Sequence, residues 1–313
     1  MKRDRPACPA GVRAGSVALV GWTNVGKSTL LNRLVGDKLA AVAEVAQTTR
    51  HRITGVCNLA GRGQIVLVDT PGLHHPRFKM NRAMITQVHR TLRAVDLGLV
   101  VIDAERGPGE GDHRAAELLR RAEVERLAVL NKIDRVRPKS RLLPMMQTVV
   151  ERWEIPEVLA VSARTGEGCG RLLERLLEGL PPGDPLFPED YLTDQTERAL
   201  AAEWIREKLL AVLRQELPHA TAVLVESWCE RDDGIVEIRA SILVDKESQR
   251  QIVIGKDASL LKQIGTDARA ELEQLLGKRV FLRLWVKFRK DWRNDERVLR
   301  ELGLDSVGSS AGS

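Results

Sequence analysis

The chain has 313 residues, of which 43% are hydrophobic and 29% charged, and its formal net charge is +6. This length suits two domains, and the hydrophobic content is sufficient for their cores. The positive charge hints at a polyanionic partner, although solubility alone would account for it. The four cysteines are scattered without a C-x-x-C pair, which argues against a zinc site or a disulfide framework and favours a reducing compartment.

The first residues and the hydropathy of the chain bear on where the protein is located. Residues 1–14 are basic and have no apolar core, so we expect no secretory signal. No apolar run approaches the ~18 residues that a membrane-spanning helix needs. We therefore expect a cytoplasmic monomer, and leave open a peripheral contact with the cytoplasmic face of the inner membrane.

The sequence G-W-T-N-V-G-K-S-T at 21–29 fits the phosphate-binding pattern G-x-x-x-x-G-K-[ST]. An apolar run at 16–20 predicts a buried strand before it, and 29–35 has helical spacing after it. The glycines let the backbone curl its N–H groups around a phosphate, Lys27 adds charge for the outer phosphates, and Ser28 offers a hydroxyl to Mg²⁺. A chance match would lack this context, so the motif predicts nucleotide binding.

A polar segment with Thr48 and Thr49 follows the first helix. After a P-loop helix, a threonine hydroxyl can complete the Mg²⁺ shell only when a γ-phosphate is present, as in a switch segment. Taken alone, residues 46–52 would rather be interpreted as a plain basic loop.

Two strands are predicted at 53–59 and 65–68, joined by a glycine-rich hairpin turn. The second strand ends in Asp69-Thr70-Pro71-Gly72-Leu73. An aspartate at the end of a buried strand is costly unless it has a partner, and a metal-bound water beside the P-loop would serve Asp69. Gly72 can supply an N–H to the γ-phosphate.

Further strands are predicted at 97–102, 127–130 and 157–161, and further helices at 80–93 and 111–122. The strand 127–130 runs into N-K-I-D. Asp134 can accept hydrogen bonds from N1–H and the 2-amino group of guanine, a donor pair that adenine lacks. Asn131 can brace the loop and contact the base, and the Lys132 stem can lie along its face. The backbone N–H of Ala163, in the S-A-R segment after the last strand, can reach the guanine O6.

The alternation of strands and helices predicts an α/β domain, with a mostly parallel sheet and helices on both faces. All of these motifs fall at carboxyl ends of strands, where such sheets bind ligands. Residues 180–188 are proline-rich and predict a linker. We place this domain at 14–181, the linker at 182–192, a second domain at 193–304, and a disordered tail at 305–313.

The second domain is predicted to contain a helix at 193–213 capped by Thr193 or Asp194, strands at 221–229 and 235–244, helices at 246–253 and from about 259 to 276, a strand at 280–288 and a terminal helix at 294–302. This order predicts an α+β type II KH fold, which clamps single-stranded RNA on a G-x-x-G loop. Here the fourth loop position is Ala258, whose methyl group we expect to hinder close approach of a sugar-phosphate. We also expect Asp257 to repel phosphate.

The candidate RNA contacts are Ile254, Gly255, Lys256, Asp257, Ala258, Lys262, Arg269, Lys287, Arg289 and Lys290. Each lysine could equally be a solvated surface charge. Trp285 and Trp292 could stack on bases. For Trp292 we favour a structural role, in which it anchors the last helix.

The ordered set G-W-T-N-V-G-K-S, Q-T-T-R, D-T-P-G-L, N-K-I-D and S-A resembles the Era family of bacterial ribosome-assembly GTPases, within the TrmE-Era-EngA-like group. The resemblance extends over 17–304, including F-P-E-D-Y-L-T-D and L-W-V-K-F-R-K-D-W. It implies binding of GTP or GDP with Mg²⁺, and hydrolysis of GTP to GDP and phosphate. It also implies binding of the 3′ end of 16S ribosomal RNA during 30S subunit assembly.

The resemblance implies catalytic roles for Asn24, Lys27, Thr48, Thr49 and Gly72. It implies that Mg²⁺ is bound by Ser28, Thr48, Thr49 and Asp69. It implies that the nucleotide is contacted by Gly21, Trp22, Thr23, Asn24, Val25, Gly26, Lys27, Ser28, Thr29, Asp69, Thr70, Pro71, Gly72, Leu73, Asn131, Lys132, Ile133, Asp134, Ser162, Ala163 and Arg164. Asn24 matches the asparagine that ligates K⁺ in relatives. Leu73 stands where many small G proteins carry a water-orienting glutamine, so slow turnover is expected. Trp22 and Thr23 depart from the usual Arg-Pro of the family.

Two other classes of protein share part of this pattern. A GTPase of tRNA modification shares the P-loop asparagine and the D-T-P-G-apolar segment, but it would need a folate-binding or cysteine-bearing catalytic region, for which this sequence has no candidate. A passive RNA scaffold would fit Thr23 and Ala258 as marks of lost activity, but Lys27, Ser28 and Asp69 argue against it. For an active GTPase, we expect GTP to order the switch segments and so bias the orientation of the second domain.

Overall fold

The computed structural model describes residues 11–43, 49–73, 77–213 and 217–304. By their internal contacts, residues 1–39, 52–74 and 87–194 form one compact unit, and residues 40–51, 75–86 and 195–313 form the other. Two segments of the N-terminal half, 40–51 and 75–86, therefore belong to the unit that contains the C-terminal residues.

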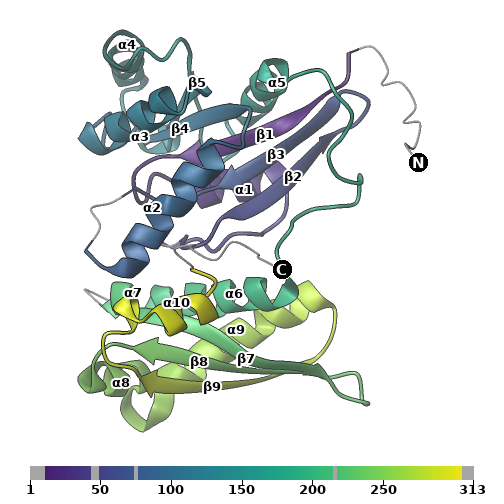
Figure 1. Cartoon of the computed structure of the whole chain (residues 1–313), viewed down its shortest axis with the longest axis vertical. Helices are drawn as coiled ribbons and strands as arrows, with labels where there is room; N and C mark the ends of the chain where they lie inside the picture. Colours follow the sequence, from purple (N-terminus) through teal and green to yellow (C-terminus); the bar gives the residue numbers. More distant parts are fainter. Residues whose placement is uncertain (1–10, 44–48, 74–76, 214–216, 305–313) are drawn as a thin grey trace, which may run out of the picture. The chain divides into compact units, whose positions relative to one another are not determined.

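The first unit contains β1 (Arg13–Val20), α1 (Lys27–Val35), β2 (Ile53–Leu59), β3 (Gly63–Asp69), the later part of α2 (Lys79–Leu92), β4 (Leu97–Asp103), α3 (Glu110–Arg121), β5 (Glu125–Asn131), α4 (Leu142–Trp153), β6 (Val158–Ala160) and α5 (Cys169–Gly179) (Figure 1). The sheet order is β2-β3-β1-β4-β5-β6, and only β2 is antiparallel to its neighbour. The predicted α/β class is confirmed. The helices α4 and α5 are additions that the sequence analysis did not predict.

Helices pack on both faces of this sheet, and successive side chains of each strand point to opposite faces. On one face, side chains of the central strands such as Val20 and Ile102 form a core with Leu92 of α2, Leu119 of α3 and Val149 of α4. Val17 and Leu19 alternate with that set and are also fully buried, on the side where α5 contacts β1 and β3 and α1 contacts β3. The loops at the carboxyl ends of the strands are thus held by a core that is packed on both sides.

The second unit contains α6 (Glu197–Val212), α7 (Leu217–Ala220), β7 (Thr221–Glu230), β8 (Val236–Val244), α8 (Glu247–Ile254), α9 (Ser259–Leu276), β9 (Val280–Phe288) and α10 (Glu296–Glu301) (Figure 1). In its sheet, β8 lies between an antiparallel β7 and a parallel β9. Side chains of α6 and α9, including Ile205 and Ile264, pack with Ile238 and Ile242 of β8. The predicted type II KH order of elements is confirmed.

The predicted start of the long helix is wrong. α6 begins at Glu197, and its cap is Thr196, whose hydroxyl accepts a hydrogen bond from Ala199 N at 3.2 Å. The two predicted caps serve β2 instead: Thr193 Oγ1 donates to Thr54 O at 2.6 Å, and the Asp194 carboxylate accepts from Thr54 Oγ1 at 2.9 Å. Tertiary contacts thus took the oxygens that would have capped a longer helix.

The predicted terminal helix at 294–302 is also shorter in the structure. A single 3-10 turn at Trp292–Asn294 precedes α10. Asp295 then caps α10, because its Oδ1 accepts hydrogen bonds from Arg297 N at 2.9 Å and Val298 N at 3.4 Å. None of the helices that the structure describes is long and apolar enough to cross a membrane.

The proline-rich segment after α5 is attached along β2, the edge strand of the first sheet. Val56 N donates to Leu192 O at 2.8 Å, and Asn58 Nδ2 donates to Glu189 O at 2.7 Å. Gln64, which is fully buried, accepts from Leu186 N and Phe187 N through Oε1, at 2.8 and 2.9 Å. The segment therefore covers an edge that would otherwise be open to pairing with another strand.

The substitution Gln64→Ala is expected to lower the free energy of unfolding by about 1–3 kcal/mol, because it leaves part-buried backbone groups of the linker without their partner. Urea unfolding followed by circular dichroism would measure the loss. Gln147→Ala, at an exposed position of α4, provides the control and should change stability by less than about 0.5 kcal/mol. Equal stabilities of the two variants would show that the linker contacts contribute nothing.

Candidate nucleotide and nucleic-acid sites

The phosphate-binding loop joins β1 to α1. Asn24 and Gly26 have left-handed backbone angles, with φ of 63° and 93°. A Cβ on Gly26 would overlap the side-chain nitrogen of Asn131, so only glycine fits between the loop and β5. Asn131 Nδ2 in turn donates to Val25 O at 2.9 Å. The predicted bracing of the P-loop by the N-K-I-D asparagine is confirmed.

Lys27 is the first residue of α1, and only 6% of its surface is exposed. Its Nζ donates to the backbone oxygens of Gly21 and Trp22, at 3.3 and 3.1 Å. Burial lowers the pKa of Lys27, while the nearby carboxylates of Asp69 and Asp112 act in the opposite direction. The lysine is thus held inside the loop, where phosphate oxygens could replace the carbonyl oxygens as acceptors.

The D-T-P-G-L segment is attached to the same loop. Ser28 Oγ donates to Asp69 Oδ2 at 2.7 Å, which brings together the hydroxyl and the carboxylate predicted to bind Mg²⁺. Leu73 N donates to Gly21 O at 3.2 Å. Thr70 Oγ1 donates to Leu19 O at 2.8 Å, so this threonine supports the backbone of β1.

Close packing fixes Gly72 and Trp22. A Cβ on Gly72 would lie 3.0 Å from Thr23 Cγ2 and 3.3 Å from Lys27 Nζ, so the glycine lets the two segments approach. A Cβ on Gly111, in the first turn of α3, would overlap the Trp22 ring. Trp22, at one of the two positions where the resemblance implies a departure, is thus seated against a glycine of α3.

The predicted base-recognition residues meet at the ends of β5 and β6. Ala163 N donates to Asn131 Oδ1 at 3.0 Å, and Ser162 Oγ donates to Asp134 Oδ1 at 2.6 Å. Lys132, which has a left-handed φ of 64°, extends its Nζ to Asn24 O at 2.7 Å. Three separate segments, around 24, 131–134 and 162–163, are thereby connected at one edge of the sheet.

The Asp134 carboxylate is charged and oriented. Arg164 Nη2 lies 2.5 Å from Asp134 Oδ2. Burial acts to raise the pKa of Asp134, but the hydrogen bond from Ser162 and the charge of Arg164 outweigh it, so the pKa lies below its ordinary value. An ionised carboxylate is the form that accepts two hydrogen bonds from guanine.

Two supporting residues of this site were not predicted from the sequence. Asp103, at the end of β4, accepts from Lys132 Nζ at 2.7 Å. Arg33 of α1 donates through Nε to Ala163 O at 2.9 Å and through Nη2 to Arg164 O at 2.6 Å. Asp103 carries the same signal that pointed to Asp69, an aspartate at the end of a buried strand, whereas nothing in the sequence connects Arg33 to the 162–164 loop.

Of the two predicted switch threonines, the structure describes only Thr49. Thr48, like Gln47, lies outside the described residues. Thr49 is 6% exposed and belongs to the segment 40–51 of the second unit.

The KH loop connects α8 to α9. Gly255, Asp257 and Ala258 all have positive φ, of 74°, 52° and 59°. The predicted cations around the loop are exposed, and among the described residues Lys256, Lys262, Arg269 and Lys290 make no ion pair. Lys287 and Arg289 are paired, with Glu226 at 2.5 Å and Glu301 at 3.5 Å. Trp292 is fully buried, which confirms its predicted structural role and excludes it as a base-stacking platform.

Ala258 occupies a conformation that costs an L-residue about 1–2 kcal/mol. Ala258→Gly is therefore expected to raise the free energy of unfolding by about 0.5–1 kcal/mol, after the entropic cost of glycine is subtracted. Ala270→Gly, at an exposed interior position of α9, is the matched control and should lower stability by about 1 kcal/mol. Urea unfolding of both variants would contradict the prediction if the two lost stability equally.

Comparison with known proteins agrees with both domains. Residues 16–132 match a family model described as 50S ribosome-binding GTPase, and residues 216–293 match a KH domain model. GTPase Era of Geobacter metallireducens is 44% identical over 292 residues, which cover 93% of this chain and 97% of the relative. GTPase Era of Thermoanaerobacter pseudethanolicus is 44% identical over 294 residues, with 94% and 97% covered.

Solved structures extend the comparison to the fold. Era in complex with MgGDPNP and nucleotides 1506–1542 of 16S ribosomal RNA superposes with a TM-score of 0.91, at 37% identity, covering 94% of this chain and 99% of that one. A variant of Aquifex aeolicus Era bound to GDP and AlF4⁻ gives a TM-score of 0.90, at 38% identity, with 93% and 99% covered. With relatives this similar over nearly its whole length, the chain belongs to the Era family of GTPases, enzymes that hydrolyse GTP.

Proposed function

We propose that this GTPase couples its nucleotide state to binding of the 3′ end of 16S ribosomal RNA during assembly of the 30S subunit. The observation that carries the proposal is the presence, in one chain, of a guanine-recognition corner beside a P-loop and of a KH loop surrounded by cations. The relative that was solved with nucleotides 1506–1542 of 16S ribosomal RNA supports the choice of RNA.

We propose Mg²⁺ as the metal of the nucleotide site. Its residues fit the ion, because Ser28 Oγ and Asp69 Oδ2 lie 2.7 Å apart and are both hard oxygen donors. When bound, Mg²⁺ would supply positive charge against the charge that develops on the phosphates. This chain would supply the rest of the electrostatic environment through Lys27 and the backbone N–H groups of the loop.

We propose K⁺ as a second ion, held by Asn24. The left-handed backbone of Asn24 is fixed by the contact between its carbonyl oxygen and Lys132 Nζ. A cation there could offset phosphate charge as an arginine finger does. GTP hydrolysis is expected to be faster in K⁺ than in Na⁺ at equal ionic strength, and Asn24→Ala should remove the difference. Equal rates of GTP hydrolysis in the two salts for the unsubstituted protein would contradict the proposed K⁺ site.

The composition of the second unit supports the proposed coupling between nucleotide state and RNA binding. This unit includes segments 40–51 and 75–86, which follow the P-loop helix and the D-T-P-G-L motif in the chain. Arg50 Nη1 donates to Thr221 O at 2.7 Å, and Lys79 Nζ lies 2.7 Å from Glu296 Oε1. A nucleotide that reorders these segments would therefore act on elements that pack with the RNA-binding fold.

The test compares GTP-analogue-loaded and GDP-loaded protein for binding to a short single-stranded RNA that copies the 16S 3′ end, with a scrambled RNA beside it. The proposal expects selective binding of the true sequence by the GTP-analogue form. Ala258→Gly run in parallel shows whether the loop methyl group weakens the grip. If neither form discriminated between the RNAs, the GTPase would stand and the ribosomal role would fall.

We also propose the domain limits 14–181 and 193–304, a monomeric state, and a cytoplasmic location with peripheral contact at the inner membrane. The attachment of 186–192 along the first sheet and the start of α6 at Glu197 support a boundary in this region. Analytical ultracentrifugation tests the monomer, and co-sedimentation with anionic vesicles tests the membrane contact.

A further inference from the structure

The KH sheet has a second face, opposite to the one on which α6 and α9 pack. Along β9, Leu282, Leu284 and Val286 pack with the helices, and the residues between them are exposed. We call this second face the open face; its central residues are Glu226, Arg231, Glu237, Arg239, Ser241, Phe281, Arg283, Trp285 and Lys287. In the register of β8 and β9, Arg239 lies beside Arg283 and Ser241 beside Trp285.

Aromatic and guanidinium groups form flat surfaces on the open face. Phe281 and Trp285 are 37% and 40% exposed. The guanidinium carbons of Arg231 and Arg283 lie 4.6 and 4.9 Å from the centre of the Phe281 ring. Alternate residues of one strand are about 6.6 Å apart, so Phe281, Arg283 and Trp285 form a row at regular spacing. Bases of single strands stack on such rings and on guanidinium planes.

The open face also carries an excess of positive charge. Arg231 and Arg239 share one carboxylate, that of Glu237, and donate to it at 2.8 and 2.7 Å. Lys287 is paired with Glu226. Arg283 makes no ion pair with any residue that the structure describes, so the four cations exceed the two carboxylates by two charges.

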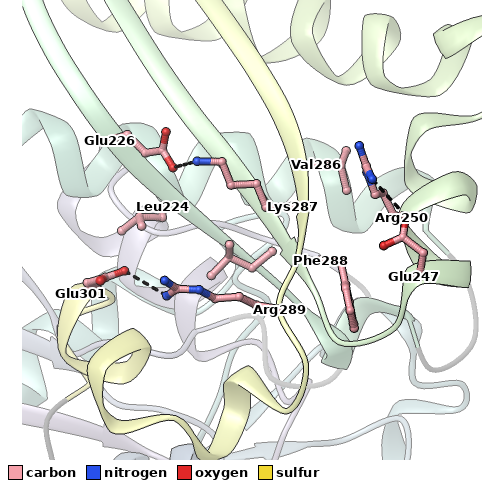
Figure 2. Close-up of a pocket in the computed structure, with 10 residues that line it drawn as sticks. Leu224, Glu226, Glu247, Arg250, Val286, Lys287, Phe288, Arg289 and Glu301 are labelled. Atoms are coloured by element: carbon pink, nitrogen blue, oxygen red, sulfur yellow. Dashed lines mark hydrogen bonds and ion pairs between the residues drawn. The ribbon is translucent and has the colours of Figure 1, made fainter.

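One end of the open face is covered by other side chains, and the rest of this face is accessible. Ala222 and Leu243 are buried under Trp292 and the side chains of α10. Next to that end, a groove of about 460 Å³ lies between Lys287 and α8. Figure 2 shows Glu226 and Lys287 pointing toward one another on one side of this groove, with Glu247 and Arg250 of α8 on the other. Because α8 leads into the KH loop, the groove connects the open face with the helix of that loop.

We propose that the open face binds a further stretch of the same single-stranded RNA that the KH loop holds, by stacking bases on Phe281, Arg283 and Trp285 and attracting phosphates with Arg239 and Lys287. This inference rests on the proposed function, since it needs RNA at the KH loop. The open face fits RNA better than a protein partner. A protein partner typically binds a contiguous apolar patch, and here charged side chains separate the two aromatic rings.

The experiment measures the affinity of the full-length, GTP-analogue-loaded protein for two labelled RNAs by fluorescence anisotropy. The short RNA has about six nucleotides, enough for the four that a KH loop clamps, and the long RNA has about 20. Phe281→Leu with Trp285→Leu keeps both side chains apolar and removes the rings. The double variant is expected to bind the long RNA at least about tenfold more weakly and the short RNA unchanged, and Phe281→Tyr with Trp285→Phe should restore binding.

Two further readouts separate the open face from the KH loop and from a folding defect. Arg239→Ala should reduce the slope of log Kd against log salt by about 0.7 for the long RNA, whereas Arg171→Ala, an exposed arginine of α5, should not change it. In the unsubstituted protein, a photoreactive long RNA should crosslink to the peptide that carries Phe281 and Trp285. Unchanged affinity in the ring-free variant, without such crosslinks, would overturn the inference and leave the proposed function standing. If the unsubstituted protein bound neither RNA, both would fall.

Discussion

Asp134→Asn is expected to weaken GTP binding by roughly 10²–10⁴-fold. The carboxylate can accept from two donors of guanine, and each hydrogen bond to a charged group contributes about 1.5–3 kcal/mol. An amide presents one oxygen and one NH₂ group, so one guanine donor would face another donor. Isothermal titration with GTP and GDP would measure the loss.

A change of base separates recognition from a structural defect. Xanthine has a carbonyl group where guanine has the 2-amino group, so the side-chain amide that this substitution introduces could donate to it. Xanthosine triphosphate should therefore bind the variant better than GTP does. Stability should change little, because Arg164, the ion-pair partner of Asp134, is 67% exposed and surface ion pairs contribute little. Equal loss for both nucleotides, or an unfolded variant, would contradict the assigned role.

Arg164→Ala provides the matched control. It removes the ion pair and leaves the carboxylate with its hydrogen bond from Ser162. Because Arg164 contacts the oxygen that guanine would also use, its removal should leave GTP affinity within about threefold. A loss as large as that of Asp134→Asn would mean that the ion pair, and not base recognition, determines binding.

The sequence predicted the nucleotide edge well because its parts are local. A strand, a motif and a helix follow one another within a few residues, and the glycine at position 26 is required by the backbone of the loop itself. Asn131 and Asp134 were found for the same reason, since strand β5 delivers both. What pattern analysis could not supply was the contact of Lys132 with Asp103, because that contact depends on the neighbouring positions of β4 and β5.

The predictions that were wrong or incomplete also involve contacts formed only in the folded protein. Thr193 and Asp194 have the residue types of helix caps, but Thr54 lies close enough to use both of them. The KH loop was recognised from its order of elements, but the left-handed backbone of Ala258 is a property of the folded loop. The membership of 40–51 and 75–86 in the second unit has no local signal at all. Contacts between residues far apart in the chain decide the first and the last of these features.

Trp292→Ala is expected to lower the free energy of unfolding of the second unit by about 3–5 kcal/mol. The indole is fully buried, and its Nε1–H donates to Ala220 O at 3.0 Å. It packs with Val298 and Leu299 of α10 and with Met80 and Met84 of the 75–86 segment. Thermal unfolding with hydrogen exchange, which resolves the two units, would measure the loss.

The same substitution tests the coupling of nucleotide and RNA. The guanidinium carbon of Arg50 lies 5.6 Å from the centre of the Trp292 ring, so the indole contacts both segments that follow the nucleotide motifs in the chain. Where the variant is still folded, at low temperature, it should bind RNA equally in its GTP-analogue and GDP forms. Trp292→Phe keeps most of the packing and loses one hydrogen bond, so it should cost about 1 kcal/mol and retain the nucleotide dependence.

The two tryptophans of this region should then behave in opposite ways. Trp285 is 40% exposed on the open face, and its replacement should leave stability within about 0.5 kcal/mol while weakening binding of the long RNA. Trp292 is buried, and its replacement should first reduce stability and then remove the nucleotide dependence. If Trp292→Ala kept a distinct RNA affinity for each nucleotide, the segments 40–51 and 75–86 would have to act through other contacts, and the coupling proposed through this cluster would be wrong.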